Sequence, residues 1–244
     1  MKLLSLLLTF IIFNSYASSN IVGGEPVSPS DPISRFTVAV GAIGNSGKCS
    51  GFLIHPEFVI TAGHCIWDAP SGFEVYFGVD VYRPEAYIKV SALRVLGGGN
   101  DGVNDLALLQ LERPAPSNFK PIPMLDPRMI DLTSPLMLAG FGQSHPLRMY
   151  KVSLTPHDYD QGFIHFKQTL QSGGACYGDS GSPAIYQRGG QSFVVGYTTR
   201  GDAQDCTGTV TYVQISPHVD WIGQTMRELS LLSSASESLT SPLR

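Results

Sequence analysis

Residues 173–185 read GGACYGDSGSPAI and carry the strongest local signal for chemistry in the chain. Ser180 lies in it between Gly178 and Gly181, directly after Asp179. Glycine lets a backbone approach a ligand closely, whereas a serine hydroxyl is a weak nucleophile until a neighbouring base removes its proton. A serine in a glycine-rich turn is more often only structural, so a catalytic role for Ser180 requires a base and a carboxylate elsewhere.

A candidate base lies in FVITAGHCIW (58–67), where His64 follows an apolar strand and precedes Cys65. The ordinary pKa of histidine is near neutral, which suits a group that takes and returns a proton. A candidate carboxylate, Asp105, stands at the head of an apolar strand in NDLALLQL (104–111). An Asp there often only ends a loop, but with His64 and Ser180 it completes a set for nucleophilic catalysis. The other histidines have no comparable context: His55, His145, His157, His165 and His218.

The composition limits both the partners and the fold. Charged residues make up 15% of the 244 residues, against about 25% in an average domain. The net charge of −4 provides no basic field to attract nucleic acid or an anionic membrane. The 26 glycines and 17 prolines favour many turns between short strands. Runs rich in β-branched and aromatic residues predict strands at 36–40, 49–54, 73–78, 106–111, 136–142, 163–168, 193–198 and 209–215.

Helical periodicity appears only near the end of the chain. In SPHVDWIGQTMREL (216–229), Ser216 is placed to cap the helix and Pro217 to occupy its first position. The apolar residues recur on one helical face: Val219, Ile222, Met226 and Leu229. The Ser-rich residues 230–244 are expected to form a tail. Because proline is poorly tolerated in central strands, the Pro-rich stretch 113–125 predicts a connector between two β lobes.

The first 17 residues, MKLLSLLLTFIIFNSYA, resemble a secretory signal, with small residues at the expected cleavage site. Their apolar run of 3–13 is too short to span a bilayer as a helix, which needs about 20 residues. A buried strand or an uncleaved anchor is the alternative. Removal of 1–17 would leave 18–20 as a short pro-segment and place the protein outside the cytoplasm, secreted or periplasmic, without a membrane span.

Four cysteines suit an oxidising compartment as two disulfides. Their spacing fits no zinc pattern, and three pairings are possible. The stretch GGGNDG (97–102) matches a dinucleotide motif, but a strand-like run follows it where a helix is needed. The stretch HDYD (157–160) is a weak metal candidate, more simply a solvated loop, and 73–90 contains no convincing acidic calcium loop. We therefore expect no metal and no cofactor.

Five motifs occur together in one order: IVGG (21–24), TAGHC (61–65), DLALLQL (105–111), AGFG (139–142) and GDSGSP (178–183). In order and approximate spacing they resemble the chymotrypsin/trypsin-like serine peptidases, from Ile21 to about Leu229. The resemblance implies an all-β fold of two antiparallel six-stranded β-barrels with a C-terminal helix and the active site between the barrels. Barrel one would span about 21–113, barrel two about 120–215, and the helix about 217–229.

The resemblance also implies roles for individual residues. Ser180 would attack the scissile carbonyl, His64 would carry its proton, and Asp105 would orient the imidazole. The N–H groups of Gly178 and Ser180 would form the oxyanion hole. The disulfides would pair Cys49 with Cys65 and Cys176 with Cys206.

In the family, an Ile-Val-Gly-Gly segment becomes the amino terminus after cleavage and folds inward. Here the ammonium of Ile21 would pair with Asp179, which needs a partner if it is buried. The residue before the cut is Asn20. Because the substrate pocket is expected to be apolar, we expect another protease or an aminopeptidase to cut at Asn20–Ile21.

The specificity pocket follows from the same resemblance and takes in Gly174, Ala175, Thr199, Gly201 and Val210. None of them is charged, so we expect cleavage after small-to-medium aliphatic residues, with aromatic residues next. Arg200 stands where the family usually has Trp and alters the neighbouring subsite.

The expected activity is that of a secreted, monomeric serine endopeptidase acting on proteins or peptides through an acyl-enzyme. The sequence is also compatible with two alternative functions. One is a non-catalytic binding protein on the same fold, since fold does not determine function. The other is a processing protease or toxin with narrow specificity.

Overall fold

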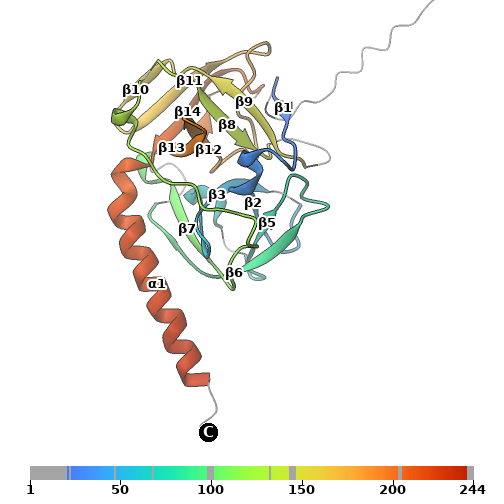
Figure 1. Cartoon of the computed structure of the whole chain (residues 1–244), viewed down its shortest axis with the longest axis vertical. Coiled ribbons are helices and arrows are strands. Elements are labelled where there is room, and N and C mark those ends of the chain that lie inside the picture. Colours follow the sequence, from blue (N-terminus) through green and yellow to red (C-terminus); the bar gives the residue numbers. More distant parts are fainter. Residues whose placement is uncertain are drawn as a thin grey trace, which may run out of the picture.

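The computed structural model describes residues 21, 23–46, 48–67, 69–97, 102–131, 133–142, 147–202 and 205–240, with the backbone alone for 235–240. The expected signal and pro-segment, and 98–101 of the glycine-rich loop, lie outside the described residues. The chain forms two β lobes, one above the other in Figure 1, with a long helix along one side. This confirms the predicted fold class: mostly β, with a closed six-stranded barrel, a second sheet and a C-terminal helix.

The first lobe is the closed barrel. Its strands are short and mostly buried, as expected for barrel staves whose inward side chains fill the interior. Phe52, Phe58 and Phe77 are completely or almost completely buried in its core. In order around the barrel the strands are β2 (Thr37–Ala42), β3 (Cys49–His55), β4 (Phe58–Ala62), β7 (Leu106–Leu111), β6 (Ala86–Val95) and β5 (Phe73–Phe77).

The second lobe has eight strands in its sheet, two more than predicted. The additional short strands β1 and β10 form its edges, and β1 pairs with β9. The segment at 25–26 therefore joins the second lobe, although the sequence placed it with barrel one. The sheet order is β1 (Glu25–Pro26), β9 (Tyr150–Leu154), β8 (Leu136–Gly140), β12 (Pro183–Arg188), β13 (Gln191–Gly201), β14 (Gly208–Gln214), β11 (Phe163–Gln168) and β10 (Asp158–Asp160).

The Pro-rich connector runs without a strand from one lobe to the other. Its first part is held by the first lobe, where the Ile122 N–H donates to the carbonyl of Leu53. Its last part is held by the second lobe, where Leu125 donates to the carbonyl of Val194. Within the described ranges, short 3-10 turns lie in the connections at Pro32–Arg35, Gly63–Cys65, Gly102–Asn104, Pro127–Met129 and Ser216–His218.

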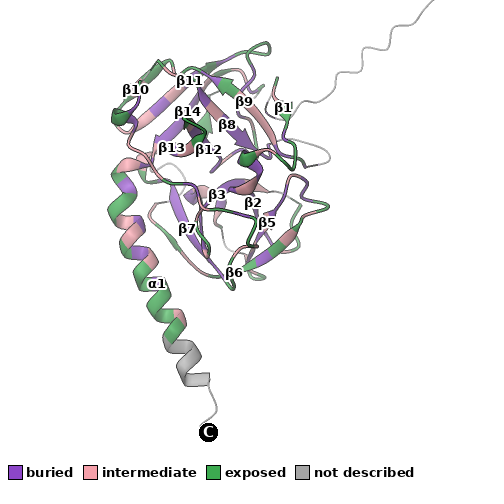
Figure 2. Cartoon of the chain, viewed as in Figure 1, coloured by how far each residue is buried: buried purple, intermediate pink, exposed green. Residues whose placement is uncertain are grey.

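The C-terminal helix α1 (Val219–Thr240) is longer than the sequence predicted and includes 230–240 of the expected tail. Ile222 and Leu229 are buried against the first lobe, while the following turn, with Leu231, is exposed (Figure 2). Serines within this part of the helix donate their hydroxyls to carbonyls of the preceding turn, as Ser230 does to Met226. In the described part of the chain, no helix is long and apolar enough to cross a membrane.

Candidate active site

His64 and Asp105 are brought together by strand pairing inside the first lobe. Strands β4 and β7 are antiparallel, and Ala62 at the end of β4 lies opposite Leu106 at the start of β7. His64 follows β4 in a 3-10 turn, and Asp105 immediately precedes β7. The register therefore places the imidazole and the carboxylate at the same end of the barrel.

The contact between these two residues is direct and mostly buried. The His64 backbone N–H donates to Oδ1 of Asp105 at 2.7 Å, and His64 Nδ1 lies 2.7 Å from Oδ2. The hydroxyl of Thr199 donates to the same Oδ2. Burial acts to raise the pKa of Asp105, but the hydrogen bonds from His64 and Thr199 outweigh it and leave that pKa below its ordinary value. Asp105 is thus a buried carboxylate kept ionised by its donors.

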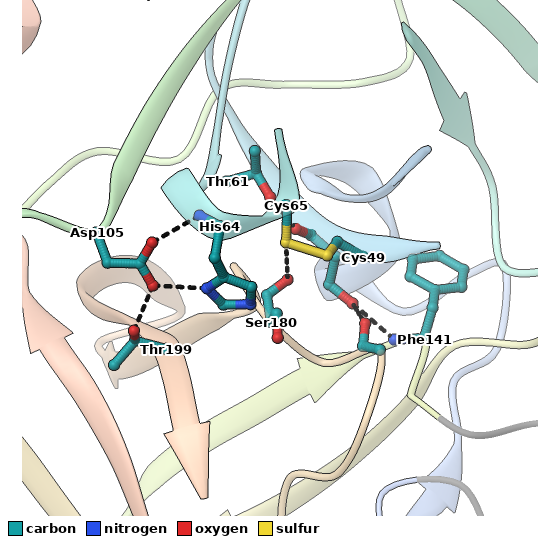
Figure 3. Close-up of a disulfide and its surroundings, with 10 residues drawn as sticks. Cys49, Thr61, His64, Cys65, Asp105, Phe141, Ser180 and Thr199 are labelled. Atoms are coloured by element: carbon teal, nitrogen blue, oxygen red, sulfur yellow. Dashed lines mark hydrogen bonds and ion pairs between the residues drawn. A yellow bond between two sulfur atoms is a disulfide. The ribbon is translucent and has the colours of Figure 1, made fainter. Parts of the chain in front are cut away.

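Ser180 comes to the same place from the second lobe. Its loop is fixed on both sides, since the Ser50 N–H donates to the Ser180 carbonyl at 2.9 Å and Gly181 N–H to the Thr198 carbonyl at 2.7 Å. In Figure 3 the His64 ring lies between the Asp105 carboxylate and Ser180. No hydrogen bond joins the Ser180 hydroxyl to His64 among the described residues. Such contacts are often long in a substrate-free site.

The backbone around Ser180 presents two free donors. In the described chain, neither the Gly178 N–H nor the Ser180 N–H donates to a protein acceptor, whereas the intervening Asp179 N–H bonds the Cys176 carbonyl at 3.0 Å. Gly178 has φ +93°, a conformation that favours glycine. Its carbonyl accepts from the Ser50 hydroxyl at 2.9 Å. The arrangement can bind an oxyanion next to the hydroxyl of Ser180.

Asp179 is completely buried behind this loop. Its carboxylate accepts from the N–H groups of Gly142 and Cys176, each at 2.8 Å. No cation pairs with it in the described part of the chain. Burial raises the pKa of Asp179 to about 7, and the two backbone donors oppose that rise only in part. Ile21, its expected partner, is likewise completely buried.

A cavity of about 380 Å³ opens beside His64 and Ser180. Four of the five predicted pocket residues line it: Ala175, Thr199, Gly201 and Val210. Gly174 is not among the lining residues; it lies against the carboxamide of Gln168, where a side chain at position 174 would collide. Gln168 and Arg200 are lining residues that the sequence did not assign to the pocket.

The two disulfides brace the site from both lobes. Cys49–Cys65 ties β3 to the turn that carries His64, and Cys176–Cys206 joins two walls of the cavity. These are the pairs that the resemblance implied. Among the described residues, one group could approach metal-binding geometry, namely Cys49, His64 and Cys65. Its two sulfurs are already bonded to each other, so they offer no thiolate.

A scan against protein families matches the model described as Trypsin to residues 21–222, which is most of the chain. The chain belongs to the trypsin family. It is 29% identical to mast cell protease 3 of Ovis aries, across 95% of this chain and 99% of that protein. It is 25% identical to granzyme B of Rattus norvegicus, across 93% and 100%, and 28% identical to serine protease SP24D of Anopheles gambiae, across 87% and 83%.

This trypsin-family chain is accordingly a serine endopeptidase. Sequence reasoning missed two residues that hold its site in place, Ser50 and Gln168. Ser50 lies in strand β3, which contains none of the five motifs. Its contacts with Gly178 and Phe141 join segments that are distant in the sequence. Gln168 ends β11 opposite Gly208 of β14. Neither residue stands in a local pattern that signals a functional role.

Proposed function

We propose that Ser180, His64 and Asp105 are the catalytic triad of a secreted endopeptidase that cuts after uncharged residues. The observation that carries the proposal is the position of the His64 ring, which hydrogen-bonds a buried carboxylate and lies next to Ser180. An imidazole held in this way has one nitrogen left for the serine proton.

In the proposed reaction the Ser180 hydroxyl oxygen attacks the scissile carbonyl while the free His64 nitrogen takes its proton. The imidazolium then passes the proton to the departing amine, which leaves an acyl-enzyme. A water molecule, deprotonated by His64, releases the acid and restores the serine. The ionised Asp105 stabilises the imidazolium at both stages, in keeping with the lowered pKa of that carboxyl.

The free N–H groups of Gly178 and Ser180 are proposed to bind the oxyanion of the tetrahedral intermediate. Donors aimed at the developing charge need no reorganisation during the reaction. Removing one such donor typically costs about 10²–10³ in rate. Ser50 supports this role because it holds the Gly178 carbonyl and thereby the direction of the loop.

The pocket supports uncharged P1 residues, P1 being the residue whose carbonyl is attacked. Among the described side chains that line the cavity there is no carboxylate, and Arg200 is one of the lining residues. A buried Lys or Arg of a substrate would lose its hydration without gaining a counter-charge. The apolar wall that includes Val210 and Ala175 underlies the expectation of aliphatic substrates.

Activation is proposed to require a protease acting at Asn20–Ile21. The buried Asp179 lacks a described cationic partner, and an isolated buried carboxylate is costly. A new ammonium at Ile21 would supply the missing charge and stabilise the loop before Ser180. Secretion is supported by the two disulfides, which persist in oxidising compartments.

The direct test is labelling of the secreted, processed protein with an active-site fluorophosphonate, together with digestion of casein. We expect label on Ser180, and loss of both label and digestion in Ser180→Ala. The matched control is Ser153→Ala, an exposed serine on β9, which should label and digest normally. A processed protein that neither labels nor digests casein would refute the proposal.

A further inference from the structure

The cavity beside Ser180 adjoins a second hollow of about 350 Å³ on the second lobe. The two spaces share two lining residues of β13, Arg200 and Gly201. The remaining lining of the second hollow comes from β11, β14 and the turn after β13: His165, Asp202, Thr209 and Thr211. A peptide that leaves the active-site cavity along the end of β13 therefore passes Arg200.

Strand register places the Arg200 side chain on the outer face of the sheet. Arg200 lies opposite Thr211 of β14, and Thr211 lies opposite His165 of β11. Directly opposed residues share a face of a sheet, and successive residues along a strand alternate between its faces. Val210, which is buried and lines the active-site cavity, therefore points to the other face. Arg200 is thus placed to meet substrate residues beside P1 rather than P1 itself.

The guanidinium of Arg200 is held in place by an aromatic ring and has no counter-charge. Its Cζ atom lies 5.7 Å from the centre of the Phe163 ring, within the range of a cation–π contact. Arg200 is exposed, and no ion pair joins it to a carboxylate among the described residues. A guanidinium can bind a carboxylate through two parallel hydrogen bonds, so this group is free to accept an acidic ligand.

The carboxylates around the second hollow are already engaged by other donors. Asp202 Oδ1 accepts from the Thr209 N–H at 2.7 Å. Asp160 Oδ1 lies 2.8 Å from His165 Nε2. Asp202 still carries its charge and weakens the attraction of Arg200 for a second carboxylate. We therefore expect a preference of modest size.

We propose that Arg200 is a specificity determinant that binds the carboxylate of a substrate Asp or Glu among the three residues before P1, which are P2, P3 and P4. In an extended peptide these residues cover about 10 Å of chain beyond P1. The inference rests on the proposed function, because it assumes that the cavity beside Ser180 receives P1. It adds recognition of an acidic residue to the uncharged P1 cavity.

The charge of the whole chain makes such a preference informative. The net charge of −4 disfavours the approach of acidic peptides in general. A preference for an acidic residue at one substrate position must therefore come from a nearby cation. A Lys or Arg at the same substrate position would face Arg200 as a like charge.

The same recognition bears on the activation step. The residues before Asn20 are Ser18 and Ser19, which carry no carboxylate. A second copy of this chain would therefore gain nothing from Arg200 when it cuts at Asn20–Ile21. This agrees with the separate activating protease proposed above.

The test uses fluorogenic peptides that share one well-cleaved P1 residue and carry Asp, Asn or Lys in turn at P2, P3 and P4. Asp and Asn have nearly the same shape, so their ratio isolates the charge. For the processed enzyme we expect kcat/KM at one of these positions to be about three- to fivefold higher for Asp than for Asn, with Lys lowest. Because salt screens an exposed ion pair, 1 M NaCl should reduce this ratio to about twofold or less.

Variants at position 200 separate the guanidinium from the rest of the hollow. Arg200→Gln should bring the Asp-to-Asn ratio to about one, and Arg200→Glu should make Lys the best residue at that substrate position. Arg200→Lys should keep part of the preference, because it retains the charge without the planar fork. Arg188→Gln, on the exposed end of β12, is the matched control and should keep the full ratio.

Fluorophosphonate labelling of each variant reports whether its site is assembled. If the variants at position 200 do not label, the position scan and its salt dependence on the unmodified enzyme decide alone. An enzyme that labels at Ser180 and cleaves, but shows no preference for Asp at P2, P3 or P4, overturns the role of Arg200 and leaves the proposed function intact. A preference that survives Arg200→Gln in a labelled variant overturns it as well. Absence of both label and cleavage with every peptide would instead refute the proposed function.

Discussion

In the first lobe, His64 and Asp105 are joined by two hydrogen bonds of 2.7 Å that follow from the pairing of β4 with β7. In the second lobe, the Ser180 loop is held by Ser50 of the other lobe and rests on the buried Asp179. Asp179 has no described cationic partner. The base half of the site is thus positioned within one barrel, whereas the loop that carries the nucleophile is held by contacts from both lobes.

This difference indicates where regulation can act. Strand pairing in a closed barrel is cooperative and leaves no free edge, so the His64–Asp105 pair is expected to exist before and after processing. A loop that contains a buried carboxylate without a described cationic partner can change its state when a new charge arrives. Processing at Ile21 would then act on the second lobe alone.

The largest effect is expected from Asp105→Asn, which disrupts the His64–Asp105 pair of the first lobe. An amide in place of the carboxylate holds the wrong imidazole tautomer, which typically lowers kcat by about 10⁴-fold. KM should change little, because Asp105 is not expected to contact substrate. Steady-state kinetics on a good peptide measures this, and Asp131→Asn, an exposed carboxylate, is the control. A loss below tenfold would contradict the role given to Asp105.

The next effect concerns Asp179 and pH. With residues still attached before Ile21, the pKa of Asp179 is about 7 in the fold, against 3.8 ordinarily. The folded state therefore binds more protons than the unfolded state between these values, and stability falls as pH rises from about 4 to about 7. In the processed chain we expect the Ile21 ammonium to lower that pKa and to remove the fall.

Melting temperatures of both forms across this pH range measure the difference, with Ser180→Ala in each to prevent self-digestion. We expect the unprocessed form to lose several degrees more than the processed form. Asp179→Asn in the unprocessed form should abolish the excess. Equal pH slopes in the two forms would show that Ile21 is not the partner of Asp179.

A smaller effect is expected from Ser50→Ala, which weakens the link between the lobes. The hydroxyl donates to the Gly178 carbonyl and accepts from the Phe141 N–H, each at 2.9 Å. Leaving these buried groups unsatisfied should cost about 1–3 kcal/mol in the free energy of unfolding, as measured by urea denaturation. The exposed Ser46→Ala is the control. Stability equal to that of the control would show that the Ser50 hydroxyl does not stabilise the contact between the lobes.

The smallest effect is expected from Thr199→Val, which removes one hydrogen-bond donor to Asp105 and keeps the shape of the side chain at position 199. The two hydrogen bonds from His64 remain, so kcat should fall by about tenfold at most. Initial-rate assays at a saturating concentration of peptide measure kcat, and Thr133→Val at an exposed position is the control. A loss approaching that of Asp105→Asn would mean that Thr199, rather than His64, holds the carboxylate in place.

The sequence predicted those features whose signals are local. Short motifs marked His64, Asp105 and Ser180 as candidates, and apolar runs between turns predicted most strands. The end of α1 was missed because serine is ambiguous, and hydroxyl-to-carbonyl bonds such as that of Ser230 become visible only in the folded helix. Gln168 was missed because its position beside the cavity depends on the register of β11 with β14.

The most direct test compares the rate of fluorophosphonate labelling in three matched chains. One begins at Ile21, one retains Ser18-Ser19-Asn20 with Asn20→Pro to block processing, and one begins at Ile21 and carries Ser180→Ala. We expect rapid labelling of Ser180 in the first chain, slow or no labelling in the second, and none in the third. Equal labelling of the first two chains, or a label that persists without Ser180, would contradict it.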